Sequence, residues 1–139
     1  MPNQRPNKVI LDTNLWISFL IGKELQGLKD LIVNENIKLV TCSQLINELK
    51  IVTTREKFKK YFDQEKVEEL MSLLDIVSLN VKIRKVEQIC RDPKDDFLLA
   101  LSKESNADFL ITGDKDLLDI KMYGKTEILT VKKFKAKMK

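Results

Sequence analysis

Four acidic side chains stand where a predicted strand or helix meets the edge of the fold. Asp12 follows the apolar run 9–11, and Asp114 follows a second apolar run later in the chain. Asp96 stands at a predicted helix start, and Glu48 lies on the flank of an apolar helix face. Carboxylates brought together repel one another, so such a group is reasonable only around a cation. Because an all-oxygen set without histidine suits Mg²⁺ or Mn²⁺ better than zinc, we expect a site for one of these two ions.

Each of these acids also has a simple structural explanation when it is taken alone. Asp12 could accept a backbone hydrogen bond and cap the helix that follows it. The acids within 92–96 could supply favourable first-turn charges on a helix dipole, and Asp114 and Asp116 could be turn residues. Glu48 is the hardest to explain in this way, because a lone buried carboxylate is costly. The case for a metal site therefore depends on all four acids meeting.

The elements that would position these acids are predicted from the apolar pattern. Runs that are apolar at every position predict strands covered on both faces, as in a parallel sheet. Strands are expected at 8–12, 37–41, 76–79, 107–112 and 127–130. Helices are expected over 15–21, 25–32, 44–53, 54–74, 93–101 and 131–138. Strands that alternate with helices predict an α/β fold, a three-layer α/β/α sandwich with a central parallel sheet, whose ligands bind outside the carboxyl ends of the strands.

The predicted domain organisation is simple. Residues 1–7 are expected to form a flexible N-terminal arm, and 8–139 a single domain with a helical, variable region at 54–90. Within that region, no pattern decides the structure of 80–91. Ser43 is expected to cap the helix 44–53. Pro93, at the first helical position behind Asp92, is a strong signal for the start of the next helix.

Composition limits the possible functions. The chain has 139 residues, of which 43% are hydrophobic and 33% charged, as in a soluble domain with a substantial core. No secretory core or membrane span is present, and two cysteines make no disulfide framework, so a cytoplasmic protein with buried thiols is expected. The absence of histidine excludes Ser-His-Asp triads and His-based zinc sites. A net charge of +4 permits a polyanionic partner without requiring one.

Four segments, in order along the chain, resemble the acidic motifs of PIN domains. They are VILDTN at 9–14, EL at 48–49, RDPKDDFLLA at 91–100 and ITGDKDLL at 111–118. The resemblance is closest to the toxin components of bacterial toxin–antitoxin systems, the VapC-like group. It implies a PIN-like fold, a Mg²⁺- or Mn²⁺-dependent endoribonuclease of a type II system, an RNA substrate, a homodimer and inhibition by a cognate antitoxin protein.

The resemblance also implies a set of site residues. The catalytic and metal-binding acids would be Asp12, Glu48, Asp96 and Asp114, with Asp116 as an auxiliary ligand. Asp96 is favoured as the third acid because the family acid directly precedes the apolar run 97–100. Asp95 remains an alternative, because Asp92 and Asp95 crowd the same position. Hydroxyl and amide groups expected to orient the carboxylates or water are Thr13, Asn14 and Thr112.

The expected reaction is attack on an RNA phosphodiester by a metal-activated hydroxide, which leaves 5′-phosphate and 3′-hydroxyl ends. Basic side chains must then hold the RNA. The candidates are Arg55, Lys57, Lys59 and Lys60, and in the tail Lys132, Lys133, Lys135, Lys137 and Lys139. The tail lysines could instead be a solvated helix face. The aromatic stripe Phe58, Tyr61 and Phe62 could stack on bases, or pack on the core or on a partner.

Other protein classes fit the acids less well. A haloacid-dehalogenase-like phosphatase needs a second acid two residues after Asp12, where this chain has Asn14. A receiver domain needs adjacent acids early in the chain, and none are present there. The serious alternative is a PIN-like module that binds RNA or protein without cleaving it. Acids at all four motif positions argue against that alternative.

Overall fold

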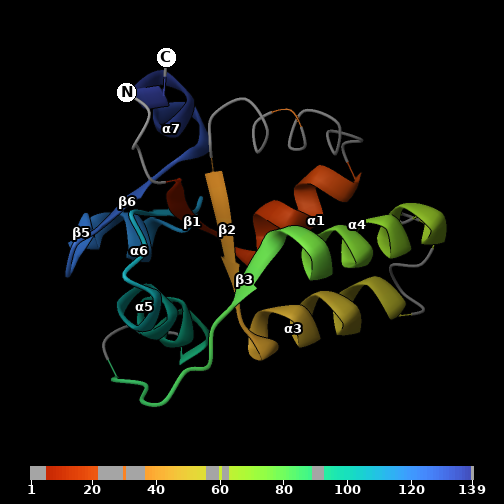
Figure 1. The fold of residues 1–139 in the computed structure, drawn as a ribbon, viewed down its shortest axis with the longest axis horizontal. Helices are drawn as coiled ribbons and strands as arrows, with labels where there is room; N and C mark the ends of the chain where they lie inside the picture. Colours follow the sequence, from red (N-terminus) through yellow and green to blue (C-terminus); the bar gives the residue numbers. More distant parts are fainter. Residues whose placement is uncertain are drawn as a thin grey trace.

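The central sheet determines the architecture of the protein. The structure, a computed structural model, describes residues 6–21, 30, 37–55, 60, 63–88 and 93–138. Its strands are β1 (Asn7–Leu11), β2 (Ile37–Thr41), β3 (Ser78–Asn80), β4 (Phe109–Ile111), β5 (Met122–Tyr123) and β6 (Thr126–Leu129). They form one sheet in the order β3-β2-β1-β4-β6-β5 (Figure 1). All neighbouring strands are parallel except β5, which runs antiparallel to β6.

The two middle strands, β1 and β4, are the apolar runs that lead to Asp12 and Asp114. Their side chains from Val9 to Leu11 and from Phe109 to Ile111 are all buried, as the unbroken apolar pattern predicted. Leu11 lies opposite Ile111 in the register of the pair. The first residues beyond both strands are therefore delivered to the same edge of the sheet.

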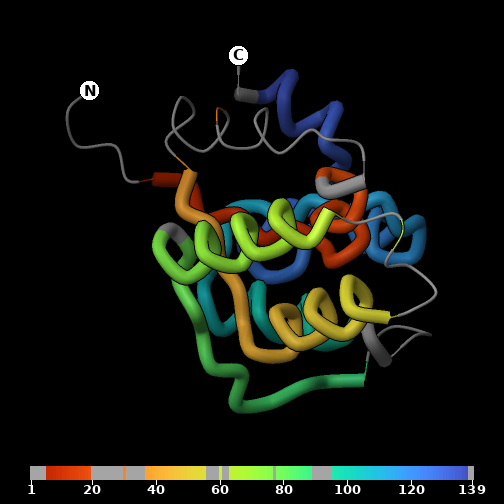
Figure 2. The backbone as a smooth tube through the Cα atoms, turned by 90° about the vertical axis from the view of Figure 1, so that its right-hand side faces the viewer, coloured from red at the N-terminus to blue at the C-terminus, as the bar shows by residue number. Residues whose placement is uncertain are grey.

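Helices cover this sheet. They are α1 (Thr13–Ile21), α3 (Ser43–Thr54), α4 (Gln64–Val77), α5 (Pro93–Ser105), α6 (Lys115–Ile120) and α7 (Val131–Met138). In Figure 1, α1, α3 and α4 gather on the right of β2, and Figure 2 views this side from the front. The helix α5 contacts β1 and β4, while α1 packs on α3. This arrangement confirms the predicted three-layer α/β/α sandwich, and no helix of the described residues is long and apolar enough to cross a membrane.

The prediction of one continuous helical stretch over 54–74 is wrong. The chain leaves helix α3 at Arg55, whose backbone is extended at φ −64° and ψ 132°. A separate helix, α4, starts after Asp63, whose side chain accepts a hydrogen bond from the backbone N–H of Glu65 at 2.9 Å. Because Asp63 satisfies an amide that the helix itself cannot, it marks a true helix start inside the charged pattern. The predicted helix 25–32 lies outside the described residues apart from Asp30.

Some predicted boundaries are also wrong. The helix α4 extends into the predicted strand 76–79, so that β3 contains only its end. Ile76, which suggested a strand, is 79% exposed, while Leu70 and Leu74 carry the buried face of α4. Ser43 is the first residue of α3, and Cys42 occupies the capping position without a side-chain hydrogen bond. Asn7, predicted as the last residue of the arm, already pairs with β2, and 81–88 form no helix or strand.

The start of α5 at Pro93 agrees with the sequence, although the predicted cap Asp92 lies outside the described residues. The short hairpin β5–β6 was not predicted. It turns through Gly124 at φ 60°, a left-handed conformation that glycine adopts without steric cost. Its outer strand is too short to produce an alternating pattern.

The helix α7 packs on the sheet through a buried pair of aromatic rings. Phe134 is fully buried, and its ring meets that of Phe109 edge to face, with centroids 5.3 Å apart and an interplanar angle of 71°. Edge-to-face packing of this kind adds to the free energy gained by burial. The contact explains how a helix with a lysine-rich outer face belongs to the domain.

Replacing Phe134 with alanine should therefore lower the free energy of unfolding by about 3–5 kcal/mol, the usual cost of deleting a buried phenylalanine ring. Urea denaturation measures this change. Lys133→Ala, on the exposed face of the same helix, is the control and should change stability little. Equal stability of the two variants would show that α7 is not part of the core.

Candidate metal centre

The candidate site lies where the strand order of the sheet reverses. From β1 the chain goes to β2 and β3 on one side, and later returns to β4 on the other side. In open α/β sheets the carboxyl ends of the strands at such a point leave a crevice where ligands bind. The backbone N–H of Asp12 donates to the carbonyl oxygen of Ile111 at 3.0 Å, so the pairing of β1 with β4 extends up to the crevice.

Asp12 is held on both carboxylate oxygens. The hydroxyl of Thr112 donates to Oδ2 at 2.7 Å, and the backbone N–H of Asn14 donates to Oδ1 at 3.3 Å. The side chain is only 6% exposed. Asp12 therefore accepts a backbone hydrogen bond at the start of α1, as expected of a helix-capping residue. It also lines the pocket in the crevice.

Thr112 joins Asp12 to the segment that carries Asp114. While its hydroxyl donates to Asp12, the same oxygen accepts the backbone N–H of Asp114 at 3.0 Å. Asp114 caps α6, because its Oδ1 accepts the backbone N–H of Asp116 at 2.8 Å. Asp116 itself is exposed and does not line the pocket of the other acids.

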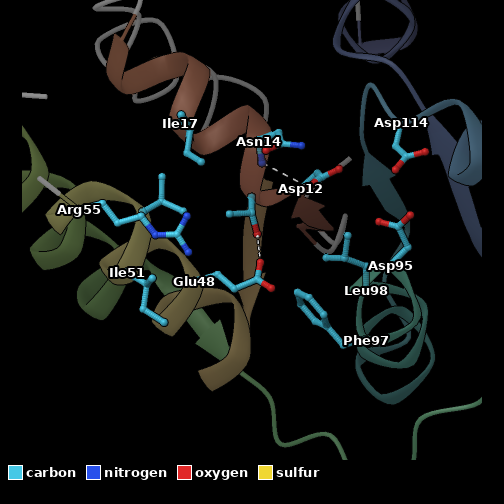
Figure 3. Close-up of a pocket in the computed structure, with 12 residues that line it drawn as sticks. Asp12, Asn14, Ile17, Glu48, Ile51, Arg55, Asp95, Phe97, Leu98 and Asp114 are labelled. Atoms are coloured by element: carbon cyan, nitrogen blue, oxygen red, sulfur yellow. Dashed lines mark hydrogen bonds between the residues drawn. The ribbon is translucent and has the colours of Figure 1, made fainter. Parts of the chain in front are cut away.

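Glu48 comes to the same crevice from α3. On that helix Leu45 and Leu49 are fully buried, so Glu48 lies on the flank of the apolar face, as its spacing predicted. The hydroxyl of Thr13 donates to Glu48 Oε2 at 3.0 Å (Figure 3). This bond links α1 to α3. The buried thiol of Cys42 lies close enough for the charge of Glu48 to act on it: burial raises the pKa of Cys42, and Glu48 raises it further.

The structure brings Asp95, rather than Asp96, to the other acids. Both are buried in the first turn of α5, but Asp95 and Leu98 line the pocket that contains Asp12. Asp96 does not line this pocket. Its charge acts instead on Tyr123, whose pKa is raised first by burial and then by Glu87, with a smaller contribution from Asp96. A step of one residue turns a helix by about 100°, which is enough to separate the two carboxylates.

The four acids that share this pocket line a space of about 480 Å³, within the roughly 300–1,000 Å³ of typical small-ligand sites. They come from four separate segments and are Asp12, Glu48, Asp95 and Asp114. Figure 3 shows Asp12, Asp95 and Asp114 on one side of the pocket, and Glu48 between them and Arg55. The sequence missed the apolar part of the lining, which includes Ile51 and Phe97.

The four pocket acids have the right chemistry for a divalent ion, although their carboxylates are not close enough together to form a complete site. The donors are all carboxylate oxygens, which suits Mg²⁺ or Mn²⁺. Within the described part of the chain, no group of three or more acidic or cysteine side chains is close enough to hold an ion. Mg²⁺ usually takes only one or two protein carboxylates and keeps several waters, so an open arrangement of this kind is compatible with it.

The predicted RNA-binding residues fall into different places. Arg55 lines the acidic pocket, and Lys60 is exposed. Outside the described residues lie Lys57, Lys59, Lys139 and the aromatic stripe Phe58, Tyr61 and Phe62. Lys132 and Lys133 are exposed in the first turn of α7, behind the carboxyl end of β6. Lys137 is instead paired with Glu127 and lies over the Phe109 ring, as expected of a structural surface lysine.

The sequence of the chain matches a known protein family. Residues 8–116 match the PIN domain family, which is more than half of the chain. The chain belongs to the PIN domain family. PIN domains are generally nucleases and typically bind divalent metals, so the protein has a nuclease-type fold. The search of curated proteins finds no matching relative.

Removing the Thr112 hydroxyl should lower the stability of this PIN domain, because the hydroxyl bridges two segments at its centre. In Thr112→Val, a buried Asp12 oxygen loses its donor and the Asp114 amide loses its acceptor. We expect a loss of about 1–3 kcal/mol in the free energy of unfolding, measured with urea. Thr112→Ser keeps the hydroxyl and is the control. If valine and serine at this position were equally stable, the hydroxyl bridge would contribute nothing.

Proposed function

We propose that the protein is a Mg²⁺- or Mn²⁺-dependent endoribonuclease that hydrolyses RNA phosphodiesters to 5′-phosphate and 3′-hydroxyl ends. One observation carries the proposal: four carboxylates from four segments of a PIN domain line a single pocket at the reversal point of the sheet. Like charges gathered in this way favour a cation among them. The all-oxygen donors favour a hard ion.

In this proposal Asp12, Asp95 and Asp114 hold the metal, with Glu48 acting directly or through water. Asp95 takes the place that the sequence motif assigned to Asp96, because it lines the pocket. When bound, Mg²⁺ or Mn²⁺ would lower the pKa of a water molecule and neutralise charge on the phosphate. A cation would also relieve the repulsion between the carboxylates.

The residues around the acids would keep them in place during the reaction. Thr112 and the Asn14 amide hold both oxygens of Asp12. Thr13 donates to Oε2 of Glu48, and no hydrogen bond from a described residue is recorded to Oε1, which could accept one from the attacking water. Because the chain has no histidine, carboxylates are its natural proton acceptors near neutral pH.

The proposal extends to the biological role that the sequence motifs imply. The protein would act as the toxin of a type II toxin–antitoxin system in the cytoplasm, as a homodimer restrained by a cognate antitoxin. The support is the resemblance of its four acidic motifs to the VapC-like group. A non-cleaving PIN-like module that binds RNA or protein is the alternative, and it predicts binding without any metal-dependent cleavage.

The decisive experiment is cleavage of end-labelled RNA with Mn²⁺ or Mg²⁺. We expect Asp12→Asn and Asp95→Asn each to slow cleavage by at least about 10²-fold, since each removes a charged ligand. Asp119→Asn, which changes an exposed acid of α6 outside the pocket, is the matched control and should keep full activity. A chelator should stop the reaction.

Two outcomes would overturn this proposal. Cleavage that survives both the chelator and Asp12→Asn would come from a contaminating nuclease or from another mechanism. Products that end in 2′,3′-cyclic phosphate would show that the 2′-hydroxyl is the nucleophile. If only Asp96→Asn, and not Asp95→Asn, abolished cleavage, the third acid would be Asp96.

Metal binding should also be visible without activity. An ion that binds only the folded site stabilises it by about 2.7 kcal/mol when its concentration is about 100 times Kd. We therefore expect Mn²⁺ to raise the melting temperature of the wild-type protein. The rise should shrink in Asp12→Asn and persist in Asp119→Asn. Equal rises in all three proteins would place the ion somewhere other than this pocket.

A further inference from the structure

The acidic pocket is also lined by side chains that cannot bind a metal ion. Arg55, Ile51 and Phe97 line it together with the carboxylates. Figure 3 shows Arg55 and Ile51 on the side of the pocket away from Asp12 and Asp114. These three residues are here called the Arg55 wall.

Arg55 is placed at the pocket by the end of α3. It is the capping residue, and its backbone N–H donates to the carbonyl oxygen of Val52 at 3.4 Å, so the chain leaves the helix at a residue that lines the pocket. Figure 3 shows the guanidinium group turned inward, toward the side of Glu48. The structure records no ion pair between Arg55 and any described residue.

An arginine in this position is suited to an anionic ligand. Among the described lining residues it is the one cation, it shares the pocket with four carboxylates, and none of the ion pairs recorded between described residues includes it. A guanidinium group presents a planar fork of N–H donors that matches phosphate, and its hydrogen bonds to phosphate are charge-assisted. A polyanion whose one phosphate lies at the acids could place its next phosphate on Arg55.

The apolar part of the wall comes from two helices. Ile51 lies about one helical turn before Arg55 on α3, whereas Phe97 belongs to α5 and lies on the other side of Glu48 (Figure 3). Ile51 is 53% exposed, although it is apolar and lines a pocket. Phe97 is 9% exposed and presents part of its ring to the same space. Apolar and aromatic side chains beside a phosphate-binding cation are the usual elements of a site for an unstacked base.

We propose that the Arg55 wall is a nucleotide subsite next to the scissile phosphate, in which Arg55 binds the neighbouring RNA phosphate and Ile51 and Phe97 contact the base. This rests on the proposed ribonuclease function. The wall would fix the direction of the RNA strand across the acids. It would also favour substrates that carry an unpaired base at the adjacent nucleotide.

The first test measures kcat/KM for RNA cleavage as a function of salt. Arg55→Ala should lower kcat/KM by roughly 10-fold, the loss expected for a hydrogen bond to a charged group. The slope of log kcat/KM against log salt should flatten by about 0.7, the contribution of one phosphate contact on a single strand. Arg55→Lys should keep the slope and recover part of the rate. Lys50→Ala, an exposed lysine of the same helix outside this pocket, is the matched control.

The second test examines the base. An RNA with one abasic nucleotide beside the mapped cleavage position should be cleaved more slowly than the intact RNA by the wild-type protein. Ile51→Ser should reduce this difference, because it removes an apolar contact to the base. Ile76→Ser is the matched control, since Ile76 is 79% exposed on α4 and does not line the pocket. Phe97 is avoided as a first target because it also belongs to the core.

The outcomes separate this inference from the proposed function. If the wild-type protein cleaves RNA and Arg55→Ala behaves like Lys50→Ala in rate and salt slope, the subsite is overturned and the nuclease function stands. If no cleavage occurs, the nuclease function fails, and fluorescence anisotropy with labelled RNA tests the wall directly. Weaker binding and a shallower salt slope in Arg55→Ala would then support the wall, and unchanged binding would overturn it.

Discussion

The pairing of β1 with β4 is the constraint on which the rest of the site depends. Leu11 lies opposite Ile111, so Asp12 and Thr112 leave the sheet side by side. The Thr112 hydroxyl then bonds to the Asp12 carboxylate and to the Asp114 amide. A shift of one residue in this register would send every side chain to the other face and break both bonds.

Structural and chemical roles coincide in the acids. Asp12 and Asp114 each accept a backbone N–H at the start of a helix, and both face the same pocket. These hydrogen bonds restrain carboxylates that would otherwise move apart, because like charges repel. Glu48 is restrained separately, through Thr13 on the neighbouring helix. The capping explanation and the metal-site explanation therefore do not compete in this protein.

The fold could be predicted where local pattern and burial agree. Residues 9–11 of β1 and all three residues of β4 are apolar and buried, so their pattern correctly predicted covered strands. Prediction failed where exposed apolar residues or short elements misled it. Ile76 suggested a strand although it is an exposed helical residue, and the two-residue strand β5 is too short to carry a pattern. The break at Arg55 was hidden because helical spacing resumes soon after it.

The sequence by itself determined the donor chemistry and most of its placement: acids at the ends of apolar strands, one glutamate beside an apolar helix face, and no histidine. Tertiary structure places Asp95, and not Asp96, in the pocket with the other acids. The residues that follow them, 97–101, are buried all round, so no polar stripe indicated which way the first turn of α5 faces. Only packing of α5 against β1 and β4 sets that rotation, and the same packing, with the end of α3, brings Phe97 and Arg55 to the acids.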